Sequence, residues 1–164
     1  MQTFLPYADF AASAVALDDR RLGKQRVEAL QVLRALTREK YGWKSHPAVR
    51  MWEGYVEACA AYAIAMCAEW TRRGYADTCA ATVGQDLAAA GFPPPRGQAE
   101  LAEQDLLPTW LGDERVHRTH RAALVRKDPS FYGEAFPDAD PEQPYFWPVR
   151  GGGSYQPLED DRPA

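Results

Sequence analysis

The sequence predicts a mostly α fold, a single compact helical-bundle domain with irregular loops and an extended C-terminal segment rich in proline and glycine. Apolar residues recur at spacings of three and four along several stretches, which is the period of a helix. No stretch alternates apolar and polar residues as a strand does, and no repeat is visible. The 164 residues are enough for one domain, and a hydrophobic fraction of 46% supplies a core, which excludes global disorder.

The first two helices are predicted within the first 40 residues. Residues 3–7 are expected to be extended, because Pro6 disfavours a helical conformation in the residue before it. Asp9 can then cap a short helix over about 10–17. A longer helix over about 19–40 carries one apolar stripe, which predicts that this face packs against the core.

A third helix is predicted over about 48–73, where apolar residues keep helical spacing up to Gly74. Pro47 suits its first turn, with Ser45 or His46 near the cap. Four segments should follow: a helix from Asp77 or Thr78 through Ala90, an extended link at 91–97, a short helix near 98–107, and a capped helix from Asp113 to about Lys127.

The C-terminal part is expected to be irregular, because residues 128–164 are rich in proline and contain GGG at 151–153. We therefore expect one helical domain over 1–150 and a flexible acidic tail over 151–164. The net charge of −4 speaks against a general nucleic-acid-binding surface. Residues 18–50, however, contain nine basic and four acidic residues, so a local basic patch can still bind phosphate.

Composition also bears on location and cofactors. The longest apolar stretch, 58–68, is far shorter than the roughly 20 residues a membrane span needs, and no basic segment suggests a secretory signal. We predict a cytoplasmic monomer without a membrane partner. Cys59, Cys67 and Cys79 lack CxxC spacing, which favours reduced core cysteines over a disulfide framework or a zinc site.

The densest polar cluster lies on the second predicted helix. Lys24, Glu28 and Gln31 are spaced i, i+4, i+7 and share one face, and Asp19 lies near the start of the helix. A neutral lysine is a nucleophile, and a nearby carboxyl can move protons, so this row suits nucleophilic or acid–base catalysis. The alternative is an ordinary helix-stabilising Lys24–Glu28 pair.

Two further clusters could contact nucleic acid. Trp43, Lys44, His46 and Arg50 combine aromatic planes that stack on bases with cations that hold phosphates. The alternative is that His46 only caps a helix. The second cluster lies in 114–127, where His117 and His120 accompany Arg115, Arg118 and Arg121. A metal site would need a third ligand that the sequence does not supply, so we predict no metal and no other cofactor, and a helix face that either follows phosphates or is only solvated.

Four stretches together resemble the pyrimidine-dimer DNA glycosylase family, whose founding member is the phage endonuclease V, and they are most similar to an uncharacterised bacterial branch. In chain order they are LDDRRLGKQRVEALQVL (17–33), HPAVRMW (46–52), EWTRRGYADT (69–78) and HRAALVRKDPSFYGEAF (120–136). The resemblance implies a compact helical bundle. It also implies excision of a damaged pyrimidine followed by strand cleavage at the abasic site.

In that family the N-terminal α-amine forms a Schiff base with C1′ of the sugar, assisted by a glutamate at the start of an early helix. An α-amine suits this role because its reference pKa is roughly 8. The sequence departs from the family pattern in two places. The bulky Gln2 should leave Met1 in place, and Gly23 occupies the position of the glutamate, so that Asp19 and Glu28 are the nearest acids. Lys24 or an activated water could replace the amine.

We therefore predict a DNA glycosylase, with or without abasic-site lyase activity, that flips a damaged or modified pyrimidine out of DNA. The catalytic candidates are Met1, Asp19, Lys24 and Glu28. The DNA-binding candidates are Arg20, Arg21, Arg26, Gln31, Trp43, Lys44, His46, Arg50, Arg118, His120 and Arg121. The alternatives are a non-catalytic nucleic-acid-binding module with the same fold, and a helical protein-interaction domain.

Overall fold

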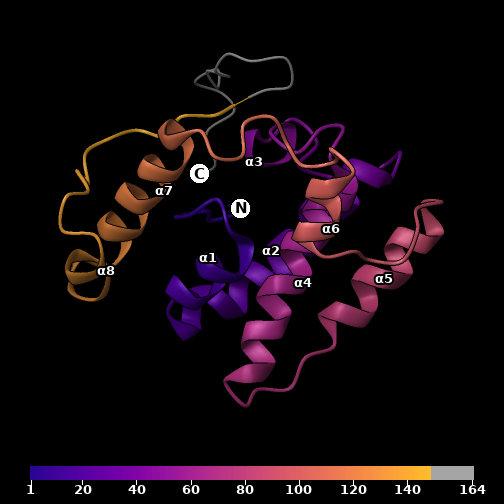
Figure 1. Ribbon diagram of the computed structural model, residues 1–164, viewed down its shortest axis with the longest axis horizontal. Coiled ribbons are helices and arrows are strands. Elements are labelled where there is room, and N and C mark those ends of the chain that lie inside the picture. Colours follow the sequence, from indigo (N-terminus) through magenta and orange to yellow (C-terminus); the bar gives the residue numbers. More distant parts are fainter. Residues whose placement is uncertain (149–164) are drawn as a thin grey trace.

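The computed structural model describes residues 1–148, which contain eight helices and no strand, so the mostly α fold is confirmed for this part of the chain (Figure 1). The expected tail at 151–164 lies outside the described residues. The helices are α1 (Phe10–Ala16), α2 (Asp19–Thr37), α3 (Pro47–Arg50), α4 (Val56–Arg72), α5 (Cys79–Ala89), α6 (Gln98–Glu103), α7 (Glu114–Lys127) and α8 (Pro129–Ala135).

Helices α2 and α4 form the centre of the molecule and pack closely against each other. Helix α1 covers α4, α5 packs against both central helices, and α7 and α8 form a pair at one side. Figure 1 shows the N-terminal end of the chain inside the molecule, between α7 and α2. The chain therefore begins between these helices, with Met1 half-buried.

The predicted caps explain where several helices begin. The side chain of Asp9 accepts a hydrogen bond from the backbone N–H of Ala12, and that of Asp113 accepts one from Arg115. His46 caps α3 by accepting from the N–H of Ala48. These interactions confirm the predicted starts of α1 and α7 and the predicted cap by His46.

Two predictions about elements were wrong. The helix expected over 48–73 is divided into α3 and α4, because Gly54 adopts a φ of 82° and the chain turns at 51–55. The region after residue 128 is not entirely irregular, because it contains α8. There the Asp128 side chain caps the helix and Pro129 fills its first turn, where proline is favoured.

Cys59 and Cys67 are buried and free, as expected, and Cys79 is free and half-buried. Within residues 1–148, no helix combines the length and the apolar character required to cross a membrane.

Candidate active site

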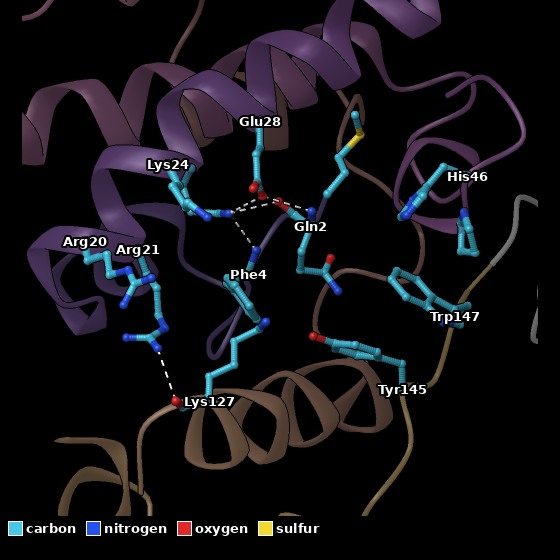
Figure 2. Close-up of a pocket in the computed structure, with 13 residues that line it drawn as sticks. Gln2, Phe4, Arg20, Arg21, Lys24, Glu28, His46, Lys127, Tyr145 and Trp147 are labelled. Carbon is cyan, nitrogen blue, oxygen red and sulfur yellow. Dashed lines mark hydrogen bonds between the residues drawn. The ribbon is translucent and has the colours of Figure 1, made fainter. Parts of the chain in front are cut away.

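A pocket of about 600 Å³ opens beside the N-terminal end of the chain. Its walls come from the N-terminal residues, α2, the start of α3, the end of α7, and the last described residues of the chain (Figure 2). The residues lining it are Met1, Gln2, Phe4, Arg20, Arg21, Lys24, Gln25, Glu28, His46, Pro47, Lys127, Tyr145 and Trp147. Segments distant in sequence therefore form one site.

The chain terminus lies next to the carboxylate of Glu28. The backbone N–H of Gln2 donates to Oε2 of Glu28 over 3.0 Å, and the side chain of Gln25 donates to the same oxygen over 3.1 Å. One residue of backbone spans at most about 3.6 Å, so the Met1 amine lies within about 7 Å of that oxygen. Oε1 of Glu28 accepts no hydrogen bond from residues 1–148, which leaves it available to a ligand.

His46 is a neutral neighbour of the terminus. Burial lowers the pKa of His46 below its usual value, and the positive charge of the chain terminus lowers it further. Because Nδ1 of the neutral ring accepts from Ala48, Nε2 carries the proton. The ring contacts Trp43 edge-on at 5.7 Å and Trp147 at 6.4 Å between centroids.

An aromatic wall faces Glu28 across the pocket. The rings of Tyr145 and Trp147 lie 4.8 Å apart, and Figure 2 shows Gln2 between Glu28 and Tyr145. Burial raises the pKa of Tyr145, so its hydroxyl remains protonated at neutral pH. Neither ring was predicted as a site residue. The available signal was the run Pro-Tyr-Phe-Trp-Pro at 144–148, in which three consecutive aromatic residues stand between prolines.

Cationic side chains surround the mouth of the pocket. Arg20 and Lys24 are exposed and form no ion pair within the described chain, and Lys127 lies near them. Arg21 is already partnered, because it pairs with Asp18 at 3.1 Å and donates to the carbonyl of Lys127. Arg20, Lys24 and Lys127 are therefore the cations available to a phosphate.

The pocket brings together six of the residues singled out from the sequence: Met1, Arg20, Arg21, Lys24, Glu28 and His46. Asp19 lies elsewhere, where hydrogen bonds from Tyr75 and Arg73 lower its pKa. Gln31 and Asp19 line a second, more open groove with Trp70, and this groove shares Arg20, Lys24 and Glu28 with the pocket.

Three DNA-binding candidates are committed to other protein groups. Arg26 pairs with Asp77 and lies 4.4 Å from the centre of the Trp70 ring. Arg121 donates to the carbonyl of Pro6 over 2.8 Å and pairs with Glu114. His120 is fully buried, and its Nδ1 accepts from the backbone N–H of Leu5 over 2.9 Å.

The remaining DNA-binding candidates lie outside the pocket. Trp43, Lys44 and Arg118 are exposed, and Arg50 is half-buried and lies 4.0 Å from Glu53. Trp43 also has a φ of 70°, in the left-handed region that non-glycine residues rarely adopt. Through its contact with His46, Trp43 lies beside the pocket mouth.

Gly23 cannot be replaced by a glutamate that reaches this pocket. A Cβ atom at position 23 would lie 3.2 Å from the ring of Trp70, so a side chain there would point toward α4. The carboxylate near the terminus is supplied five residues later, by Glu28, whose Oε2 accepts from Gln2.

A family model described as pyrimidine dimer DNA glycosylase matches residues 1–83. The matched part contains Met1, Lys24, Glu28 and His46, whereas Lys127, Tyr145 and Trp147 lie beyond it. No curated protein and no solved structure shows a significant match to the chain.

Proposed function

The chain belongs to the pyrimidine dimer DNA glycosylase family, and from this premise we propose that it excises a damaged or modified pyrimidine from DNA and then cleaves the abasic strand. The observation that carries the proposal is the contact between the N-terminal segment and Glu28 in an open pocket. A carboxylate within about 7 Å of a primary amine can exchange a proton with it through a bridging water, which imine formation at a sugar carbon requires.

In the proposed reaction, the neutral amine of Met1 attacks C1′ of the damaged nucleotide. The C1′–N bond breaks, and its electron pair leaves with the base, which takes up a proton from solvent water. Glu28 accepts a proton from the attacking amine and returns it to the ring oxygen as the sugar opens to the imine. Loss of a proton from C2′ then expels the 3′ phosphate, which cleaves the strand.

The rest of the pocket suits an extrahelical nucleotide. Tyr145, Trp147 and His46 offer ring faces or edges for a base, since stacking on aromatic side chains contributes about 1–3 kcal/mol per base. Arg20, Lys24 and Lys127 are suited to the flanking phosphates. Extrusion of a nucleotide costs a few kcal/mol and least at a lesion, which favours damaged sites.

Lys24 is the second candidate for the attacking amine, because it lines the same pocket and forms no ion pair within residues 1–148. An activated water at Glu28 would instead give a glycosylase without strand cleavage. The cytoplasmic location and the monomeric state stay predictions from the sequence.

The test uses a duplex that contains one pyrimidine dimer and a second duplex that contains one abasic site. The wild-type protein should cleave both duplexes, in each case only in the strand that carries the modified position. Glu28→Gln should reduce the rate about 10²- to 10⁴-fold, because it removes the proton-transferring group, while DNA binding is retained. Glu103→Gln, at an exposed position of α6, is the matched control and should cleave at the wild-type rate.

Two results would contradict the proposal. The first is that the folded wild-type protein cleaves neither duplex. The second is that Glu28→Gln cleaves as fast as the control, which would remove Glu28 from the reaction.

A further inference from the structure

The N-terminal segment is buried without belonging to a helix. Gln2, Thr3, Phe4 and Leu5 are each at most 6% exposed. Buried backbone N–H and C=O groups need hydrogen-bond partners, and secondary structure normally supplies them. Here side chains supply them.

The buried side chain of Gln25, on α2, forms hydrogen bonds with the backbone of Gln2 and of Phe4. Its Oε1 accepts from the N–H of Phe4 over 2.8 Å, and its Nε2 donates to the carbonyl of Gln2 over 2.9 Å. These two backbone groups fix which end of the amide is oxygen, since an N–H must face Oε1 and a carbonyl must face Nε2. Only 1% of Gln25 is exposed.

The same amide reaches the carboxylate. Nε2 of Gln25 donates to Oε2 of Glu28 over 3.1 Å, and the N–H of Gln2 donates to this oxygen over 3.0 Å. Gln25 thus contacts both the segment that carries the terminal amine and the group that would exchange protons with it. Figure 2 shows these hydrogen bonds converging between α2 and the N-terminal segment.

Side chains of α4 and α7 also form hydrogen bonds with the N-terminal segment, at Phe4 and Leu5. The hydroxyl of Tyr62, on α4, lies 2.8 Å from the carbonyl of Phe4 and 2.6 Å from Oε1 of Gln25. On α7, His120 accepts from the N–H of Leu5, and Nδ1 of His117 lies 2.9 Å from the Leu5 carbonyl. Nε2 of His117 accepts from Gly112, so in the neutral ring Nδ1 is the donor.

We propose that Gln25 is a positioning residue, which fixes the N-terminal amine relative to Glu28 so that the amine can attack C1′. The inference rests on the proposed function, in which that amine forms the imine. The attack requires a distance of about 3–3.5 Å between the reacting atoms, and an error of about 1 Å can slow a reaction about 100-fold. A fully hydrogen-bonded, buried amide is a rigid means of setting such a distance.

The test compares rate with affinity. Gln25→Met keeps the length of the side chain and removes its hydrogen bonds to Gln2, Phe4 and Glu28. At a saturating concentration of abasic duplex, we expect borohydride-trapped adduct to form about 100-fold more slowly than in the wild-type protein, with an unchanged Kd for DNA. A loss caused by general loosening of the DNA site would change the Kd as well. Gln85→Met, at an exposed position of α5, should alter neither quantity.

A milder variant covers the case in which Gln25→Met does not fold. Tyr62→Phe removes only the hydroxyl that contacts Phe4 and Gln25, and it should slow trapping by a smaller factor at unchanged Kd. Wild-type trapping rates in the folded Gln25→Met protein, or in Tyr62→Phe if the first does not fold, would overturn the positioning role alone. If the wild-type protein forms no adduct, the imine chemistry fails, and the role of Gln25 fails with it.

Discussion

Two glutamates of this protein differ because of the groups around them. Glu69 on α4 is 6% exposed and accepts hydrogen bonds from the side chains of Arg72 and Arg73. Within residues 1–148, Glu28 accepts hydrogen bonds from Gln2 and Gln25 alone, both through one oxygen. The first arrangement satisfies a carboxylate with cations and stabilises the fold, whereas the second leaves an oxygen facing a pocket.

At Glu69 the prediction concerns stability against pH. The hydrogen bond from Arg72, with a further one from Arg73, lowers the pKa of Glu69 from 4.5 to about 2. The ionised form is therefore favoured in the folded state, and its contribution is complete above the unfolded pKa and is lost as pH falls toward 2. Glu69→Gln should lower the free energy of unfolding by up to about 3 kcal/mol at pH 7.

Urea unfolding of the wild-type protein and Glu69→Gln at several pH values measures this effect. The difference between the two proteins should shrink steadily below pH 4.5. A difference that is the same at pH 7 and pH 3 would show that the carboxylate charge does not stabilise the fold.

At the scale of elements, the contact between α2 and α4 depends on a glycine. The ring of Trp70 lies 3.2 Å from the position of a Cβ on Gly23. This ring cannot easily move, because it donates to the carbonyl of Ala76 and is stacked on Tyr75 at 4.0 Å. Gly84 in α5 differs, since a Cβ there meets only Pro95 at 4.0 Å.

The two glycines should therefore respond in opposite directions to alanine. Gly84→Ala should stabilise the protein by up to about 1 kcal/mol, because alanine favours a helix over glycine by that amount. Gly23→Ala gains the same propensity but forces a methyl group against Trp70, and overpacking costs about 1–3 kcal/mol, so the net effect should be destabilising. The midpoints of urea unfolding measure both. If Gly23→Ala stabilised the protein, the ring of Trp70 would have to move aside for the methyl group, which would contradict this account.

Local sequence signals predicted most helices but not all boundaries. Asp9 and Asp113 are caps that can be recognised from the sequence because a cap acts within its own turn. The break at Gly54 was missed because apolar spacing continues across it, from Trp52 to Val56. Helix α8 was missed because the start signal Asp128–Pro129 stands in a proline-rich region that resembles coil.

At the scale of the whole molecule, the sequence named Met1 and His46 as candidates, but it could place two candidates side by side only where one helix carries both. Lys24 and Glu28 share a face of α2, which their spacing determines. The same geometry could have shown that the two candidate acids do not both face the pocket. Asp19 and Glu28 are nine residues apart and therefore lie about 180° apart around a helix.

The remainder of the site depends on tertiary contacts. The approach of Gln2 to Glu28 joins residues 26 positions apart, and Tyr145 and Trp147 come from the opposite end of the described chain. Gln25 was not predicted as a site residue, because nothing in the sequence distinguishes it from other glutamines in helices. Its role depends on the N-terminal segment that it contacts.

The central claim is that the N-terminal amine performs imine chemistry beside Glu28. The most direct measurement is borohydride trapping of the wild-type protein on a duplex with one abasic site, followed by mass mapping of the modified peptide. The predicted result is a covalent adduct on the α-amine of Met1. An adduct on Lys24, or none while the DNA is bound, would contradict the claim.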